Sequence, residues 1–276
     1  MKYLIFGKGY IGTKFLEKLG PSAVITSTDI GNISEVETII ATEKPDIVIN
    51  AAGKTGKPNI DWCEDHKKET LYSNVTGPLV LSKVCIEHQI RMVHIGSGCI
   101  YQGGSEDTYS ETDKPDPNQI PSFYSKTKAW SEEMLSYFPL LQVRLRMPID
   151  ENPQPRNLLW KITHYEKIIS VPNSISVIPD FVEATLKLIT MEKTGIYNVV
   201  NPGHITHAEI LDMYKKYIDS NFEYELFSLK ELEAVTKAGR SNCVLSTKKL
   251  EDEGIVLPEI HERLPEILQD YKKNLL

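Results

Sequence analysis

An α/β fold, with a doubly wound parallel sheet and a smaller C-terminal lobe, is predicted by three features of the chain. A glycine-rich stretch, Gly7-Lys8-Gly9-Tyr10-Ile11-Gly12, directly follows the first apolar run. Short apolar runs then alternate with amphipathic stretches as far as Leu145. Beyond Met147-Pro148 this alternation gives way to a segment that bears Pro and Asn, followed by helical patterns. Alternating strands and helices are typical of a parallel sheet with helices on both faces.

The expected elements follow from the length and periodicity of each apolar run. The predicted strands are Tyr3–Phe6, Ala23–Thr26, Ile47–Asn50, Met92–Ile95, Leu141–Leu145 and Gly195–Val200. The predicted helices are Ile11–Leu19, Val36–Glu43, Glu69–His88, Phe123–Tyr137, Leu158–Tyr165, Asp180–Met191, His207–Ile218 and Ile260–Lys273. We expect residues 1–150 to form the first domain and residues 151–276 mainly the second lobe, with residues 166–200 returning to the sheet.

The composition excludes several classes of protein. The 276 residues are 41% hydrophobic and carry a net charge of -7, whereas a nucleic-acid-binding protein normally has a basic face. No apolar run approaches the roughly 20 residues of a membrane helix. No signal peptide is recognised at the start, so we expect a cytoplasmic location without membrane contact. The four cysteines form no C-x-x-C pair, and no cluster has metal-ligand spacing, which favours a reducing compartment and no metal site.

The glycine stretch predicts a dinucleotide site on a Rossmann-type domain. Glycines between a strand and a helix let the backbone turn tightly and approach a pyrophosphate at the helix N-terminus. The residues expected to contact the cofactor are Gly7, Gly9, Tyr10, Ile11 and Gly12. The choice between NADPH and NADH stays open. Asp29 lies where an acidic residue binds the NAD ribose, whereas Thr26-Ser27-Thr28 would equally accommodate a 2′-phosphate.

A second motif predicts carbonyl reduction. Tyr124 and Lys128 are four residues apart, which places a phenol and an ammonium on one face of a helix. A tyrosine at its reference pKa of about 10 is a slow proton donor near neutrality, and an adjacent ammonium lowers that pKa. Ser97 ends the fourth strand and should face the same crevice at the carboxyl edge of the sheet. An exposed Tyr–Lys pair on a helix is the non-catalytic alternative.

Ser97, Tyr124 and Lys128 together resemble the extended branch of the short-chain dehydrogenase/reductase family. The resemblance implies that the tyrosine protonates the carbonyl oxygen and that the serine hydrogen-bonds it. It also implies that the lysine holds the tyrosine and the nicotinamide ribose. The segment Asn50-Ala51-Ala52-Gly53 after the third strand is similar to that family's cofactor-lining segment.

Longer stretches are similar to the nucleotide-rhamnose synthase/epimerase-reductase family, whose 3,5-epimerase and 4-reductase activities complete UDP-L-rhamnose. The similar stretches are residues 50–64, 98–100, 122–129, 144–149, 155–157, 161–163, 165–167, 201–203, 209–211 and 240–242. The resemblance implies UDP-4-keto-6-deoxy-D-glucose as substrate and NADPH, with NADH allowed, as cofactor. The broader relative is dTDP-4-dehydrorhamnose reductase. The glycine loop is one residue shorter than the family's G-x-x-G-x-x-G, so the exact position of the cofactor is not determined by the resemblance.

The same resemblance assigns Cys99 and Lys161 to epimerisation. A C4 ketone acidifies the protons on C3 and C5, and each inversion needs one group that removes a proton and another that delivers one from the opposite face. A thiolate beside an ammonium suits the base, and desolvation brings the pKa of a lysine toward the working range. From the residues alone, Cys99 would be read as inert packing and Lys161 as part of a solvated face.

Arg156 and Arg240 are candidates for binding the sugar nucleotide, because the arginine fork suits a diphosphate, and Asn157 beside Arg156 is also expected to bind the substrate. Surface salt bridges are the alternative for the arginines. Two other functions stay open. GDP-L-fucose synthase normally uses a histidine where Lys161 stands here, and a non-catalytic relative, such as the regulatory subunit of methionine adenosyltransferase, need not keep all five reactive residues. A homodimer and an upstream UDP-glucose 4,6-dehydratase on a separate chain are the partners that this interpretation allows.

Overall fold

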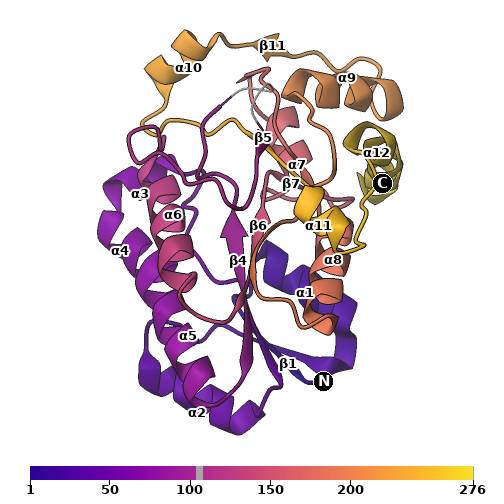
Figure 1. Ribbon diagram of the computed structural model, residues 1–276. Coiled ribbons are helices and arrows are strands. Elements are labelled where there is room, and N and C mark those ends of the chain that lie inside the picture. Colours follow the sequence, from indigo (N-terminus) through magenta and orange to yellow (C-terminus); the bar gives the residue numbers. More distant parts are fainter. Residues whose placement is uncertain (104–107, 276) are drawn as a thin grey trace.

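A sheet of six parallel strands lies at the centre of the computed structural model, which describes residues 1–103 and 108–275 (Figure 1). In spatial order the strands are β10 (Gly195–Asn198), β6 (Leu141–Leu145), β4 (Arg91–Ser97), β3 (Ile47–Asn50), β1 (Tyr3–Phe6) and β2 (Ala23–Thr26). The chain runs from β1 to β2 and then crosses back to β3 on the other side of β1. Such a reversal of strand order opens a crevice at the carboxyl ends of the two strands, here β1 and β3.

Helices cover both faces of this sheet (Figure 1). One face packs against α1 (Tyr10–Leu19) and α8 (Ile178–Thr190), and the other against α2 (Ile33–Glu43), α5 (Gly77–Glu87) and α6 (Phe123–Leu135). Neighbouring residues of a strand point to opposite faces. Ile5 and Ile49 accordingly belong to the core on the α1 side, whereas Leu4 and Val48 belong to the core on the α2 side. Burial on both faces explains why the strands read as continuous apolar runs.

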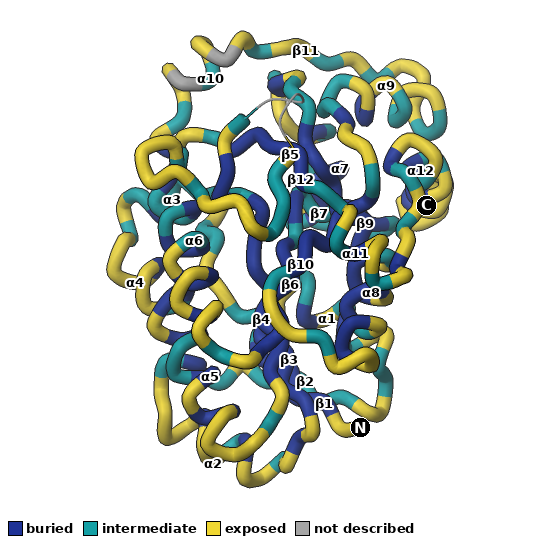
Figure 2. Tube along the Cα trace, in the orientation of Figure 1, coloured by how far each residue is buried: buried dark blue, intermediate teal, exposed yellow. Residues whose placement is uncertain are grey.

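A second core lies beyond the carboxyl edge of the sheet, where Figure 2 shows further buried segments. It packs α7 (Leu158–Thr163), α9 (His207–Tyr217) and α12 (Ile260–Leu275) around Leu159, Leu211 and Leu264. The other helices are α3 (Asp61–Asp65), α4 (Lys67–Leu71), α10 (Leu229–Val235), α11 (Lys248–Asp252), a 3-10 turn (Gly20–Ser22) and a π-helical turn, η2 (Tyr72–Thr76). No helix among the described residues combines the length and apolar character needed to span a membrane.

Three pairs of two-residue strands flank the main sheet. They are β5 (Thr108–Tyr109) with β12 (Val244–Leu245), β7 (Pro148–Ile149) with β9 (Ser176–Val177), and β8 (Lys167–Ile168) with β11 (Glu225–Leu226). Residues 166–200 were expected to return to the sheet. In that stretch α8 and β10 join the sheet and its core, whereas β8 and β9 pair elsewhere. The domain boundary near residue 150 stays a prediction.

The predicted helix Glu69–His88 is interrupted, because α4 and α5 are joined by the π-helical turn η2. Pro78 near the start of α5 has no N–H to donate to the carbonyl of Asn74, where an α-helix would place its hydrogen bond. A wider turn accommodates this loss, and π turns are frequent at functional sites. The helices α3, α10 and α11 were not predicted. At α10, Ser228 and Glu231 form a capping box, and this spacing is visible in the sequence.

A buried ion pair ties α6 to β6. Arg144, which is 1% exposed, donates from Nε and Nη2 to the two carboxylate oxygens of Glu132 at 2.7 and 2.8 Å. Its Nη1 also donates to the side chain of Asn198 on β10. Removal of one partner from such a pair leaves the other charge buried and uncompensated. We therefore expect Glu132 to matter for stability.

Replacing Glu132 with Gln should destabilise the fold by about 3–5 kcal/mol, because the Arg144 guanidinium would lose its buried counter-charge. Urea unfolding followed by circular dichroism measures this change. Glu87→Gln is the matched control, because the Glu87–Lys83 pair is exposed at the surface of α5 and its loss should leave the unfolding midpoint unchanged. Equal midpoints for the two variants would contradict a stabilising role for the buried pair.

Candidate active site

The glycine loop lies in the crevice between β1 and β3, and its three glycines are needed for different reasons. Gly7 has a φ of 103°, and a Cβ there would lie 2.7 Å from the backbone nitrogen of Ala52. A Cβ on Gly12 would collide with the carbonyl of Gly7. Gly9 caps α1 without a side-chain hydrogen bond, and nothing lies within 4 Å of the position that its Cβ would take. The first-turn N–H groups therefore meet open space, as an anion site requires.

The segment after β3 closes the other side of this crevice. Ala51 donates its N–H to the carbonyl of Phe6 at 2.9 Å, which ties the segment to the end of β1. Asn50 was expected to line the cofactor, but its side chain is fully buried and bonds to His94 and to the N–H of Ala52. Asn50 therefore shapes the segment, whereas Ala51 and Ala52 are partly exposed and Gly53 is exposed.

The Ser-Tyr-Lys set is brought together where β4 meets α6. Ser97 is the last residue of β4 and hydrogen-bonds Tyr124, while the Nζ of Lys128 donates to the carbonyl of Ile95 at 3.1 Å. Burial lowers the pKa of Lys128 to about 8. Burial and the nearby Cys99 raise the pKa of Tyr124 above its usual value. The expectation that the ammonium lowers the tyrosine pKa is therefore wrong for this state, because Lys128 points to the backbone of β4 and burial dominates.

Asn74, which the sequence reading did not single out, connects this set to the loop after β3. Its Nδ2 donates to the carbonyl of Lys54 and to the hydroxyl of Thr127, and its Oδ1 accepts the N–H of Lys54 at 2.7 Å. Asn74 lies in η2, the π-helical turn, so the interruption of the helix coincides with a side chain that holds two parts of the site. In the sequence, the adjacent Gly77 and Pro78 were the feature that could have indicated an interrupted helix near Asn74.

Cys99 lies beside the reducing set, and its thiol contacts a buried arginine. The backbone N–H of Cys99 donates to Ser97 Oγ at 3.2 Å, and Arg146 Nη1 donates to Cys99 Sγ at 2.9 Å. Lys161 approaches from α7 in the second core, close enough for Cys99 to influence its titration. Burial lowers the pKa of Lys161, Arg156 lowers it further, and Cys99 opposes both effects. Arg146 is a second site residue that the sequence reading did not identify.

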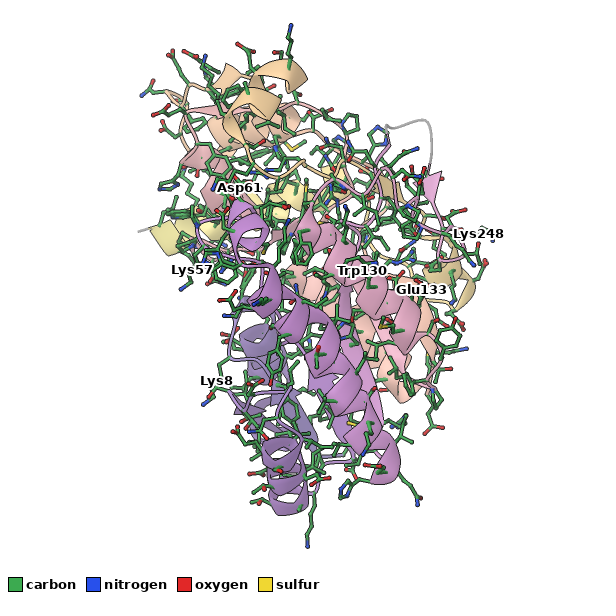
Figure 3. All side chains as sticks on the ribbon, turned by 90° about the vertical axis from the view of Figure 1, so that its left-hand side faces the viewer. Lys8, Lys57, Asp61, Trp130, Glu133 and Lys248 are labelled. Atoms are coloured by element: carbon green, nitrogen blue, oxygen red, sulfur yellow. The ribbon has the colours of Figure 1, made fainter. Side chains whose placement is uncertain are left out.

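A cavity of about 330 Å³ lies between the loop after β3 and the start of α7. Arg156 lines it and donates to Thr55 Oγ1 and to the carbonyl of Gly56. The other lining residues are Gly53, Lys54, Thr55, Gly56, Lys57 and Trp62. Lys57 lies on the same edge of the molecule as Lys8 of the glycine loop (Figure 3). Three cations and a tryptophan around one cavity suit a phosphorylated ligand that carries an aromatic ring.

Two of the predicted phosphate ligands have other partners in this state. Arg240 forms an ion pair with Asp61 at 2.8 Å and also donates to the carbonyl of Ala238. Asn157 is fully buried and caps α7. Its side-chain Nδ2 donates hydrogen bonds to the carboxylate of Asp150 and the carbonyl of Asn152. The expectation that Asn157 binds substrate is therefore corrected, because this side chain orients the helix of Lys161 instead. No group of three metal-ligating side chains gathers within the described ranges.

Comparison with known proteins gives consistent matches. Residues 1–144 match the family described as the RmlD substrate binding domain. A bifunctional dTDP-4-dehydrorhamnose 3,5-epimerase/dTDP-4-dehydrorhamnose reductase of Arabidopsis thaliana is 41% identical over 275 residues, which cover 95% of this chain and 90% of the relative. A trifunctional UDP-glucose 4,6-dehydratase/3,5-epimerase/reductase of the same plant is 39% identical, but the match spans only 41% of that longer protein.

Solved structures agree in fold. The UDP-rhamnose synthase of Acanthamoeba polyphaga mimivirus superposes with a TM-score of 0.92 at 33% identity and covers 98% of this chain and 99% of its own. A dTDP-4-dehydrorhamnose reductase of Bacillus anthracis, solved in complex with NADP, has a TM-score of 0.82 at 22% identity, with 97% of this chain and 99% of its own covered. The second likeness concerns the fold alone.

Replacing Gly9 with Ala should weaken NADPH binding at least about tenfold, since the new methyl group would occupy the open space in front of α1 and cost a close contact worth about 1.4 kcal/mol. Stability should change by less than about 0.5 kcal/mol, because the φ of -96° suits alanine. Gly7→Ala is the contrasting variant and should lose stability, because its backbone conformation and its contact with Ala52 both exclude a Cβ. Titration of tryptophan fluorescence with NADPH measures the affinity. Unchanged affinity in Gly9→Ala would place the pyrophosphate elsewhere.

Proposed function

This chain belongs to the RmlD substrate binding domain family, and from that premise we propose a bifunctional enzyme of nucleotide-sugar synthesis. It acts as a 3,5-epimerase and an NADPH-dependent 4-keto reductase, and converts UDP-4-keto-6-deoxy-D-glucose to UDP-L-rhamnose. The bifunctional activity of the Arabidopsis relative supports the pair of reactions. The mimivirus UDP-rhamnose synthase supports UDP as the nucleotide.

One observation carries the proposal: the thiol of Cys99 stands among all the other reactive groups. The backbone N–H of Cys99 bonds Ser97, and its side chain interacts electrostatically with Tyr124, Lys128 and Lys161, so the groups assigned to reduction and to epimerisation share one environment. A plain reductase needs Ser97, Tyr124 and Lys128 only. The presence of a thiol and a second ammonium at the same place supports proton exchange beside the ketone.

In reduction, Ser97 and Tyr124 bind the keto oxygen at C4. Bound NADPH supplies the hydride for C4. Tyr124 donates its phenolic proton to the oxygen, so the carbonyl becomes a hydroxyl and the phenol becomes a phenolate. The Lys128 ammonium stabilises that negative charge, and a proton from solvent restores the phenol. A raised pKa for Tyr124 fits the resting state, because the residue must hold its proton until hydride arrives.

In epimerisation, Cys99 and Lys161 act on opposite faces of the sugar ring. The Cys99 thiolate removes the proton from C3 or C5, and the electron pair of the broken C–H bond moves onto the keto oxygen. Lys161 then returns a proton to the same carbon from the other face. The thiol and the neutral amine exchange protons with solvent before the next inversion. A lowered pKa makes Lys161 a better proton donor than an exposed lysine.

The glycine loop fits a dinucleotide. The space beside Gly9 at the N-terminus of α1 is empty, whereas Gly7 and Gly12 are packed closely against neighbouring backbone. We assign the pyrophosphate to this loop. The Asp29 carboxylate accepts hydrogen bonds from the N–H of Gly31 and the hydroxyl of Tyr72, which leaves it less suited to the ribose of NADH. The Thr28 hydroxyl is hydrogen-bonded to that of Thr26 at 2.6 Å, whereas the exposed Lys8 of the glycine loop forms no ion pair within residues 1–103 and 108–275 and can meet a 2′-phosphate, which supports NADPH.

The cavity lined by Arg156, Lys54 and Lys57 is assigned to the diphosphate of the nucleotide sugar. The substrate must come from a 4,6-dehydratase. The trifunctional relatives carry that enzyme on the same polypeptide, and this chain matches 41% of the length of one of them. Whether the dehydratase partner is a separate chain, whether the enzyme is a homodimer and whether it is cytoplasmic stay predictions.

Mutation should separate the two chemistries, because proton exchange beside a ketone needs no hydride. In deuterium oxide the wild-type enzyme should place deuterium at C3 and C5 of the product, with the C4 hydrogen coming from NADPH. Cys99→Ala should slow this exchange at least about 100-fold, the scale of one acid–base group. Tyr124→Phe should do the reverse, slowing NADPH oxidation by at least about 100-fold while deuterium still enters the 4-keto sugar. Mass spectrometry and NMR of the sugars locate the deuterium.

Lys161→Ala completes this set and should resemble Cys99→Ala rather than Tyr124→Phe. Exchange at both carbons in Cys99→Ala at the wild-type rate would make this thiol a packing residue. The protein would then be a plain 4-keto reductase that depends on a separate epimerase.

The value of kcat/KM for NADPH oxidation should fall as pH rises through about 8. A lowered pKa means that Lys128 is charged at pH 7 and loses its charge well before an exposed lysine does, and kcat/KM reports the titration of the free enzyme. Lys128→Arg keeps the charge, so its residual activity should show no such fall. A flat wild-type profile from pH 7 to 9.5 would contradict the role of the ammonium.

A further inference from the structure

Arg146 lies just after β6 and is buried to 98%, with 2% of its surface exposed. Nη2 donates to the side chain of Asn173 and to the carbonyl of Ser241, while Nη1 donates to Cys99 Sγ at 2.9 Å. Nε is buried without a hydrogen-bond partner. The guanidinium is therefore held firmly by two neutral oxygens and directed at one sulfur.

The charge of Arg146 lacks the compensation that its neighbour on the chain receives. Arg144 is equally buried, and both oxygens of Glu132 neutralise it. Within residues 1–103 and 108–275, no carboxylate forms an ion pair with Arg146. An arginine keeps its proton inside proteins, and a buried charge is strongly disfavoured unless an opposite charge accompanies it. Cys243, Cys99 and Tyr124 are the groups near Arg146 that could supply a negative charge, and Cys99 is the one whose side chain Arg146 hydrogen-bonds.

We infer that Arg146 is a positioning residue that holds Cys99 as a thiolate in the free enzyme, ready to remove a proton from the sugar. The inference rests on the proposed epimerase function for the use of that thiolate, but not for its existence. The other titratable groups around Cys99 are Lys161 from α7, Lys128 and Tyr124 from α6, and Cys243 from the segment before β12. The lysines favour the thiolate when they are charged, and Tyr124 and Cys243 are neutral near pH 7.

Cys243 provides an internal comparison. It is fully buried and donates to the carbonyl of Gly98 at 3.2 Å, and burial raises its pKa. Cys85 is likewise buried, and its pKa is raised to about 12. Cys99 alone combines partial exposure with a direct contact to a guanidinium among the four cysteines. A thiolate that is exposed in this way reacts with alkylating reagents, whereas buried thiols are inert.

The test is the rate of alkylation of Cys99 by iodoacetamide between pH 5.5 and 9, read from the Cys99 peptide by mass spectrometry. An ordinary thiol reacts about tenfold more slowly for each pH unit below its pKa of about 8.5. If Arg146 stabilises the thiolate, the wild-type rate should change less than about threefold from pH 6.5 to 8.5, against about 50-fold for an ordinary thiol. Cys243 and Cys85 should stay unmodified in the folded protein.

In Arg146→Met, the rate of Cys99 alkylation should rise steeply with pH, as for an ordinary thiol. In Arg146→Lys, which keeps one positive charge, the rate should be at least partly independent of pH. Circular dichroism establishes that each variant is folded. If Arg146→Met does not fold, the alkylation rate of wild-type Cys99 decides the question. A tenfold rise in that rate for each pH unit overturns the inference, and a rate that does not change with pH upholds it. A flat profile that persists in folded Arg146→Met also overturns it, since the charge would then come from the lysines.

The outcome is independent of the proposed function, because alkylation needs no substrate. A flat wild-type profile together with normal deuterium exchange in Cys99→Ala would uphold the thiolate and refute its use as the epimerase base. A steep wild-type profile together with lost exchange in Cys99→Ala would refute the role of Arg146 and leave the epimerase intact. Solvent exchange in Arg146→Met should fall by more than NADPH oxidation does, because Cys99 serves only the first reaction.

Discussion

The arrangement of the site depends on the parallel direction of the six strands. Because all six run the same way, the segments that follow β1, β3, β4 and β6 emerge at one edge of the sheet. They deliver the glycine loop, the Ala51–Gly53 segment, Cys99 and Arg146 to adjacent positions, although these residues are far apart in the sequence. Gly7 shows how tight this convergence is, because its backbone lies against Ala51 and Ala52 with no room for a methyl group. Helices only have to bring Tyr124, Lys128 and Lys161 to the same edge.

Much of this architecture could be predicted from the sequence. All six strands of the sheet were predicted, since strands buried on both faces are continuous apolar runs bounded by loops. The glycine loop and the Tyr124–Lys128 spacing were found because each depends on local geometry, a tight turn or one helical turn. Short elements with few residues to define a period, such as α3 and α11, gave no comparable signal.

Contacts between distant segments could not be predicted in this way. Arg146 and Asn74 are ordinary residues in the sequence, and they become parts of the site only through partners that are distant along the chain. The misassigned residues have the same cause. Asn157 and Asn50 stand in stretches that resemble a family, but their amide groups are used inside the protein. The direction of the Tyr124 pKa shift was mispredicted for a related reason. The spacing along the helix shows that Lys128 is a neighbour but does not show that Tyr124 is buried.

Cys99 and Lys161 are held by different parts of the fold, and this has a mechanical consequence. Ser97, Tyr124, Lys128 and Cys99 belong to the sheet or to the helix packed on it, whereas Lys161 belongs to α7 and the second core. Arg156, next to the start of α7, bridges the same division through Thr55. A change in the distance between the two cores would move Lys161 relative to Cys99 and leave Ser97, Tyr124 and Lys128 in place. Under the proposed roles, inversion would depend on how closely the two cores approach each other, whereas reduction would not.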